Sequence, residues 1–255
     1  MKTKLLTACA VLALSAGFAF AEPTPFPRGF NNLPDGHWIR GRGDAITMPY
    51  PARDNMWFDD FCKFEETTGD DWTITQVEAG ASDSTEAVAD ADDCILAMTS
   101  DSNENDGTQI QSIGEVFTFT SGKEMYFETR LKIGDATQSD FHIGLQIRDT
   151  TASAVSDGVF FEKVDGSAAL NLDSYVGSVE ATASGLYTVV DDTYITISWY
   201  YDGGTSLVAA VDNVVVGTLT TTPTTTELTV SAGVLAGSGA ADVLSVDYIY
   251  VWKER

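Results

Sequence analysis

Short apolar or alternating runs, separated by Gly, Asp, Asn, Ser and Thr, fill the chain from Trp57 to the C-terminus. In none of them does a period of 3.6 residues persist for three turns, as an amphipathic helix would require. The stretch YITISWYYDGGTSLVAAVDNVVVGTLTT predicts two successive hairpins, because Gly203-Gly204 and Asp212-Asn213 tolerate the positive φ of tight turns. The pattern predicts an all-β fold, an antiparallel β-sandwich or jelly roll.

Three segments are expected along the 255 residues. Residues 1–21 have the layout of a secretory signal peptide, with two early lysines, an apolar run short for a stable membrane span, and a cleavage point after Ala21. Residues 22–56 hold six of the seven prolines, which fix φ and remove backbone donors, and this predicts an extended, irregular Pro-rich arm. Residues 57–255 are expected to form the jelly-roll domain.

The charge is strongly negative, and the β domain carries it. The formal net charge is −24, and 34 acidic residues stand against 8 basic ones from Trp57 onward. Such a surface repels nucleic acid and anionic membranes, so nucleic-acid binding is excluded. Acids and bases balance in the arm, whose basic and aromatic residues are candidates for contacts with a partner: Arg28, Trp38, Arg40, Arg42 and Arg53.

Cysteine and histidine are too sparse for a zinc site, because the only histidines are His37 and His142. Removal of the signal peptide would leave two cysteines, Cys62 and Cys94, in a compartment where disulfides persist. The sequence leaves two alternatives open for this pair. The cysteines form one disulfide, or they are two buried free thiols.

The stretch DSNENDG offers oxygen ligands at nearly the spacing of a calcium loop: Asp101, Asn103, Asn105 and Asp106. Its glycine comes one place later than an EF-hand loop requires, and no glutamate follows at the twelfth position. An ordinary polar turn is the alternative. Calcium is the one cofactor that the sequence indicates.

The stretch DATQSDFHIGLQIRDTT places apolar residues on one face of a strand and polar residues on the other. If the strand at 124–133 pairs with it, the polar residues of both strands line one sheet face. Candidate glycan-binding residues, including one ring from a later strand, are Arg130, His142, Gln146, Arg148 and Tyr200. The alternative is that this row is the solvated face of a sheet, and for His142 we expect a solvated or hydrogen-bonded residue rather than a catalytic base.

Several blocks in order carry a resemblance to a known family: the stretch just described, then SDGVFFEKVDG, DDTYITISWYYDGG, VDNVVVGTLTTT and LSVDYIYV. Over roughly residues 57–255 the chain resembles structural proteins of tailed bacteriophages that carry a concanavalin A-like, laminin-G-like jelly roll. The resemblance implies a non-catalytic component of the virion that decorates the capsid or belongs to a fibre. It also implies capsid or other virion proteins as partners, and a homo-oligomer.

The catalytic patterns of this fold are missing from the sequence. A laminarinase-type Glu-x-Asp-x-x-Glu strand is missing, because Glu162 and Asp165 fall on opposite faces of their strand and no second glutamate follows. The Gln-x-His strand of alginate lyases and the GxSxG motif of serine hydrolases are missing too. The sequence therefore predicts that the protein is not an enzyme.

Two functions are compatible with these observations. The first is a phage virion structural or capsid-decoration protein, located in the virion and able to adhere to surface glycans. The alternative is a secreted or periplasmic, lectin-like carbohydrate-binding protein, which the signal peptide favours.

Overall fold

The computed structural model describes residues 54–64, 71–78, 83–90, 94–151, 153–237 and 239–255. The expected signal peptide and the expected arm contacts lie outside these residues: Arg28, Trp38, Arg40, Arg42 and Arg53. Every regular element of the described part is a β-strand. A search of the same residues for a long apolar helix that could cross a membrane finds none.

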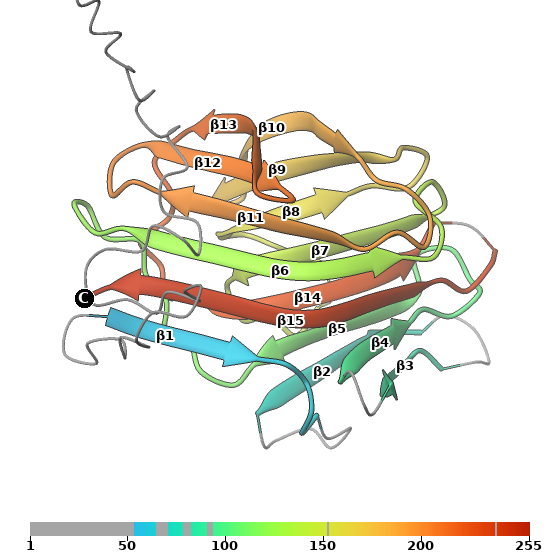
Figure 1. The fold of residues 1–255 in the computed structure, drawn as a ribbon. Helices are drawn as coiled ribbons and strands as arrows, with labels where there is room; N and C mark the ends of the chain where they lie inside the picture. Colours follow the sequence, from blue (N-terminus) through green and yellow to red (C-terminus); the bar gives the residue numbers. More distant parts are fainter. Residues whose placement is uncertain (1–53, 65–70, 79–82, 91–93, 152, 238) are drawn as a thin grey trace, which may run out of the picture.

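Two antiparallel sheets pack face to face as a sandwich (Figure 1). The eight-stranded sheet has the order β13-β12-β11-β6-β15-β4-β3, and β1 pairs with the C-terminal half of β15. Its strands are β1 (Asp54–Asp59), β3 (Thr85–Asp90), β4 (Ile95–Thr99), β6 (Met125–Ile133), β11 (Ile195–Tyr201), β12 (Ser206–Val211), β13 (Val214–Thr220) and β15 (Val243–Glu254).

The seven-stranded sheet has the order β10-β9-β8-β7-β14-β5-β2. Its strands are β2 (Trp72–Val77), β5 (Gly107–Ser112), β7 (Ser139–Gln146), β8 (Gly158–Lys163), β9 (Ala169–Val176), β10 (Val179–Thr188) and β14 (Thr229–Ala236). The prediction of an all-β antiparallel sandwich is confirmed.

The core lies between the two sheets, where alternate residues of each strand point inward. Phe141, Ile143 and Leu145 of β7 are fully buried there, as the alternation of the sequence predicts. The opposite sheet contributes Phe127 and Trp199, whose rings stack with centroids 5.7 Å apart. Each such buried side chain contributes roughly 1.5–3 kcal/mol of hydrophobic stabilisation.

Both hairpins expected in the stretch from β11 to β13 are present. Gly203 turns the chain between β11 and β12 with a φ of 81°. Asp212 and Asn213 turn it between β12 and β13 with φ values of 49° and 64°. These left-handed conformations explain why the two turns carry glycine and Asp-Asn.

The first strand is joined to the sandwich by backbone pairing and by a covalent bond. Strand β1 begins at Asp54, which pairs with Glu254, so it extends across the predicted boundary between residues 56 and 57. A disulfide links Cys62, just after β1, to Cys94, just before β4, with their Cα atoms 4.6 Å apart.

Candidate functional site on the seven-stranded sheet

Cross-strand pairing places two rows of residues on the outer face of the seven-stranded sheet. The first row, from β9 to β5, consists of Asn171, Glu162, His142, Gly233 and Gln109. The second row consists of Asp173, Phe160, Gly144, Ser231 and Gln111. Residues opposite one another in register are close neighbours on the same face, so each row is a strip across the sheet.

The connection between β7 and β8 folds back over this face, and we call residues 148–151 and 153–157 the cover loop. The backbone N–H of Ser153 donates to Gln109 Oε1 at 2.7 Å, and that of Asp149 donates to Gln111 Oε1 at 3.0 Å. Gln111 Nε2 in turn donates to the Ile147 carbonyl at 3.1 Å. The two glutamines of β5 thus hold the loop on the sheet.

His142 is buried under the cover loop and only 5% exposed, so this part of the row is not a solvated face, and the ring is hydrogen-bonded instead. Its ring lies over Gly233, where any side chain would clash with it. Nδ1 is 3.2 Å from Ser153 Oγ, and Nε2 has no hydrogen-bond partner. Burial lowers the pKa of His142 to about 4, so the ring is neutral at pH 7.

Gln146 and Arg148, the other candidates at this end of β7, differ in their surroundings. Gln146 is buried, and both polar atoms of its amide lack partners. Arg148 is exposed and donates to Thr73 Oγ1 at 2.7 Å and to the Ile113 carbonyl at 3.2 Å. It lines an open cavity of about 600 Å³ beside β2, together with Thr73, Ile74, Thr75, Glu115, Asp149 and Thr150.

On the β8 side of the cover loop, two carboxyl groups from neighbouring strands come together. Burial, the charge of Asp173 and hydrogen bonding with it raise the pKa of Glu162 to about 8. Burial also raises the pKa of Asp173, which is fully buried. Neither oxygen of Asp173 has a hydrogen bond of normal geometry, although Glu162 and Thr182 are close enough to influence its pKa. At neutral pH Glu162 is therefore largely protonated.

An aromatic pair forms the floor next to these carboxyl groups. Phe160, opposite Asp173 in register, stacks on Tyr175 with ring centroids 5.6 Å apart and an angle of 21° between the planes. Phe160 is buried, whereas Tyr175 is partly exposed, as are Glu162 and Asn171. The open part of the outer face thus combines a ring, an amide and a protonated acid.

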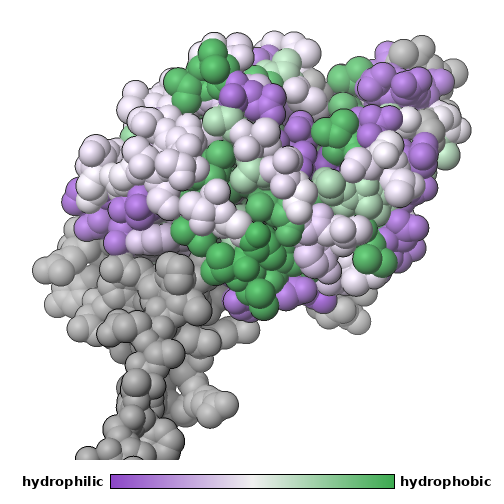
Figure 2. All heavy atoms as spheres, turned by 90° about the horizontal axis from the view of Figure 1, so that it is seen from above, coloured by the Kyte–Doolittle hydropathy of each residue, from purple (hydrophilic) through white to green (hydrophobic). Residues whose placement is uncertain are grey.

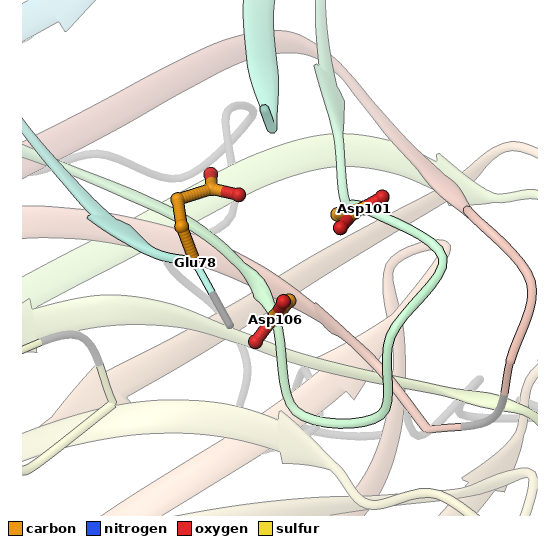
Figure 3. A group of neighbouring side chains, drawn as sticks. All are labelled: Glu78, Asp101 and Asp106. Carbon is orange, nitrogen blue, oxygen red and sulfur yellow. The ribbon is translucent and has the colours of Figure 1, made fainter. Parts of the chain in front are cut away.

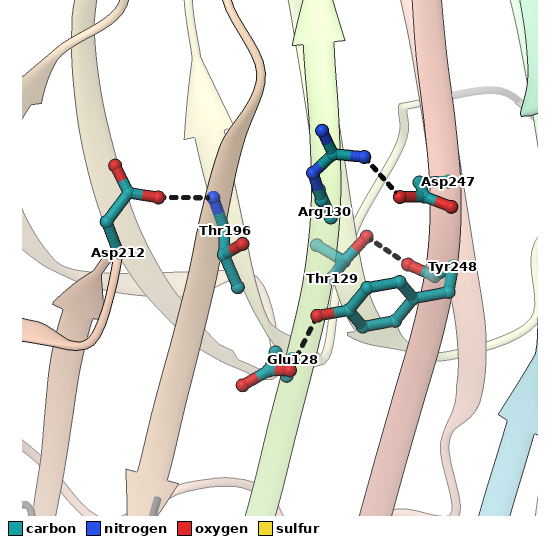
Figure 4. Close-up of polar contacts among 7 residues, drawn as sticks. All are labelled: Glu128, Thr129, Arg130, Thr196, Asp212, Asp247 and Tyr248. Atoms are coloured by element: carbon teal, nitrogen blue, oxygen red, sulfur yellow. Dashed lines mark hydrogen bonds and ion pairs between the residues drawn. The ribbon is translucent and has the colours of Figure 1, made fainter. Parts of the chain in front are cut away.

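Arg130 and Tyr200 lie on the other sheet, so the expected shared face with His142 is wrong. The strand at 124–133 corresponds to β6, which pairs with β11 and β15 and not with β7. Arg130 forms an ion pair with Asp247 (Figure 4). Its guanidinium also lies 4.2 Å from the centre of the Tyr194 ring.

A second buried carboxyl group lies on the outer face of the eight-stranded sheet. Glu128 accepts hydrogen bonds from the hydroxyls of Tyr126 at 2.5 Å and Tyr248 at 2.7 Å, the latter drawn in Figure 4. Burial raises the pKa of Glu128, and the two hydroxyls oppose this shift. Because its partners are set in place by strand pairing, the spacing along the sequence did not indicate this cluster.

The expected calcium loop forms a turn between β4 and β5. Asn103 Nδ2 donates to Asp101 at 2.8 Å and to Asp106 at 3.3 Å, and both aspartates are buried. Glu78, after β2, joins them, so that carboxylate oxygens of the three acids lie within 4.8 Å of one another (Figure 3). Asn105 contributes its backbone N–H to the Ala236 carbonyl. The sequence did not indicate Glu78, because it lies on a separate strand end.

Comparison with known proteins rests on structure, since no family model and no curated protein matches the chain. A protein of unknown function from Shewanella oneidensis is 12% identical with a TM-score of 0.55, and the match covers 79% of this chain and 87% of that protein. An endo-1,3-β-glucanase from Streptomyces sioyaensis is 13% identical with a TM-score of 0.55, and the match covers 82% of this chain and 99% of the glucanase. The Emp46p carbohydrate recognition domain is 10% identical with a TM-score of 0.52, and the match covers 76% of this chain and 94% of that domain.

These similarities establish the fold, a concanavalin A-like jelly roll, as the sequence predicted. They do not support the phage family. The structural neighbours include β-glucanases, a glycoside hydrolase family 16 protein and carbohydrate recognition domains, and this finding contradicts the prediction of a virion structural or decoration protein. The short blocks that carried the resemblance are strands and turns that the fold itself requires.

The comparisons also contradict the prediction that the protein is not an enzyme, because its structural neighbours include an endo-1,3-β-glucanase and a β-1,3-1,4-glucanase. That prediction depended on searching for acids along single strands. The structure instead brings together Glu162 of β8 and Asp173 of β9, two acids whose proximity depends on strand pairing.

Burial of neutral His142 makes the stability of the fold depend on pH. Its pKa is lower in the folded chain, about 4, than the ordinary value of 6.5, so the unfolded chain binds the extra proton first. The contribution of the buried neutral ring to the free energy of unfolding is complete above pH 6.5 and is lost as the pH falls toward 4, by roughly 3 kcal/mol. When the free energy of unfolding is measured in urea from pH 4 to 7, it should fall less steeply with pH in His142→Gln than in the wild type. The same dependence on pH in both proteins would contradict the burial of a neutral ring.

Proposed function

We propose that the protein binds carbohydrate on the outer face of the seven-stranded sheet, on the side of the cover loop where Glu162 and Tyr175 lie. The observation that carries the proposal is the partly exposed ring of Tyr175, stacked on buried Phe160 and next to a protonated Glu162. Sugar sites combine an aromatic ring, which packs against the apolar face of a pyranose, with a few polar groups that fix the hydroxyls. The glucanases and the lectin domain that share the fold support this assignment.

The charges around the site favour neutral sugars over anionic ones. Glu180, Asp140 and Asp173 all act on Glu162 and raise its pKa, and the whole chain has a net charge of −24. A uronic or sulfated sugar would meet this negative potential at close range. We therefore expect neutral glycans, and the proposed export through residues 1–21 would bring the protein to glycans outside the cytoplasm.

Replacement of Tyr175 tests the binding site directly. Tyr175→Ala removes the stacking ring and should weaken binding of a neutral gluco-oligosaccharide about tenfold, as truncation of a residue central to binding does. Tyr194→Ala, which removes a tyrosine at the opposite sheet, is the matched control and should bind like the wild type. Titration calorimetry with β-1,3-, β-1,4- and mixed-linkage gluco-oligosaccharides measures both. Equal affinity of Tyr175→Ala and wild type would contradict the site.

Glycoside hydrolysis is a second candidate function, and the raised pKa of Glu162 is the observation that favours it. A general acid must be protonated at the working pH, and a carboxyl group with a pKa of about 8 meets this requirement. Asp173, close by, stabilises the protonated form through its own charge. In this function Glu162 would donate a proton to the glycosidic oxygen as the bond between that oxygen and the anomeric carbon breaks, and water would supply the hydroxyl group that replaces it.

The pH profile of hydrolysis identifies the acid. If Glu162 is the proton donor, release of reducing ends from a mixed-linkage glucan should fall as the pH rises above about 8, because the acid form is lost. Glu162→Gln should lower kcat/KM about 100-fold or more, while Glu227→Gln, at an exposed acid whose charge acts on Lys253, should retain activity. Hydrolysis that survives in Glu162→Gln would contradict this role. Sugar binding without any hydrolysis would leave binding as the function.

Calcium stays a proposal for the cluster of Glu78, Asp101 and Asp106. Carboxylate oxygens are the ligands that Ca²⁺ prefers, and two of these acids are buried side by side. At millimolar Ca²⁺ we expect the Tm to rise by a few degrees relative to EDTA, because an ion bound only by the folded chain stabilises it. Asp101→Asn should remove the shift. The same Tm in Ca²⁺ and EDTA would contradict the proposal.

A further inference from the structure

We propose that the cover loop makes this a chain-end site, in which a neutral glycan enters over β9 and β10 and ends against Ser153 and His142. The inference rests on the proposed carbohydrate binding and adds the class of ligand. A chain-end site differs in this respect from a site that binds an internal stretch of polysaccharide across the whole sheet.

The row that contains Glu162 is open on one side and closed on the other. Asn171 and Glu162 are partly exposed, and Thr182 and Glu180 on β10 are exposed. The next residue along the row, His142, is only 5% exposed, and Gln109 beyond it is 2% exposed. With a strand spacing of ~4.8 Å, the floor from β10 to β8 is roughly 10 Å wide.

Ser153 is the residue that closes the row. Its N–H donates to Gln109 on β5, and its hydroxyl is 3.2 Å from His142 Nδ1 on β7. Since Gly233 on β14 lies between these two partners in register, Ser153 bridges the row across β14. A glycan that follows the row from Glu162 toward β2 would meet Ser153 immediately after His142.

The cover loop is fixed at its C-terminal end as well as over β5. The Asp157 carbonyl accepts from the Ile147 N–H at 2.9 Å, and the Ser156 carbonyl accepts from the Ser178 N–H at 2.7 Å. Asp157 Oδ1 accepts from the Thr224 hydroxyl at 2.6 Å and from the Gly177 N–H at 3.2 Å. These bonds connect the loop to the β9–β10 turn and to the segment before β14, so it acts as a wall.

The cavity beside Arg148 lies on the far side of this wall. Thr73 and Thr75 of β2, which line it, continue the two rows past Gln111 and Gln109. The outer face therefore has two open parts with a closed part between them. An internal stretch of polymer that enters at Glu162 has no path along the rows to Arg148, whereas a chain end needs only the open part.

The test varies the number of chain ends at constant mass of glycan. A labelled oligosaccharide from the hydrolysate is bound to the wild-type protein. Unlabelled competitors are intact β-1,3-, β-1,4- and mixed-linkage glucans and, in parallel, the same glucans after partial acid hydrolysis. With ten times as many ends, the hydrolysate should compete about ten times better per unit mass. A variant in which residues 150–155 are replaced by Gly-Gly should bind intact polymer and hydrolysate equally well per unit mass.

The outcomes separate this inference from the proposed function. If polymer and hydrolysate compete equally per unit mass with wild type, the chain-end inference is overturned and carbohydrate binding stands. If the shortened variant keeps the preference for ends, the loop is not its cause and the inference is overturned. If no glycan of the panel binds, the proposed function fails together with the inference. Should the shortened variant not fold, the wild-type comparison alone decides.

Discussion

Buried polar groups on the outer face of the seven-stranded sheet are the constraint on which the rest of the site depends. A buried amide group without a partner costs roughly 1–3 kcal/mol, so the partners of a buried glutamine stabilise the fold. Gln109 and Gln111 obtain theirs from the backbone of the cover loop, which therefore lies on the sheet. The position of the loop in turn buries His142 and leaves Glu162 at the edge of the open part.

Electrostatics divides the same face into two chemical environments. Under the loop, His142 is neutral because no carboxylate compensates the cost of burying its charge. At the edge, Glu162 and Asp173 lie so close that ionisation of both carboxyl groups is unfavourable, because the two negative charges repel one another. One carboxyl group therefore keeps its proton. A fold that places a protonated acid beside an exposed ring is suited to sugars, which offer hydroxyl groups and apolar ring faces together.

The sequence predicted the strands, their inward faces and the hairpins, because these depend on neighbours along the chain. Phe141, Ile143 and Leu145 alternate, and alternation alone assigns them to the core. It did not predict which strands pair, and for this reason Arg130 was expected beside His142 although β6 and β7 belong to different sheets. It also missed the proximity of Glu162 to Asp173 and of Glu78 to Asp101. Those contacts depend on register between strands or on separate strand ends, which a single sequence does not encode locally.

Backbone amide chemical shifts, recorded by NMR during titration with a gluco-oligosaccharide, report whether sugar binds at the open part of the outer face. We expect the largest changes at Glu162, Asn171 and Tyr175, and no change at Arg130 and Tyr200 on the opposite sheet. Changes concentrated on the eight-stranded sheet, or an unchanged spectrum at saturating oligosaccharide, would rule out binding at this face.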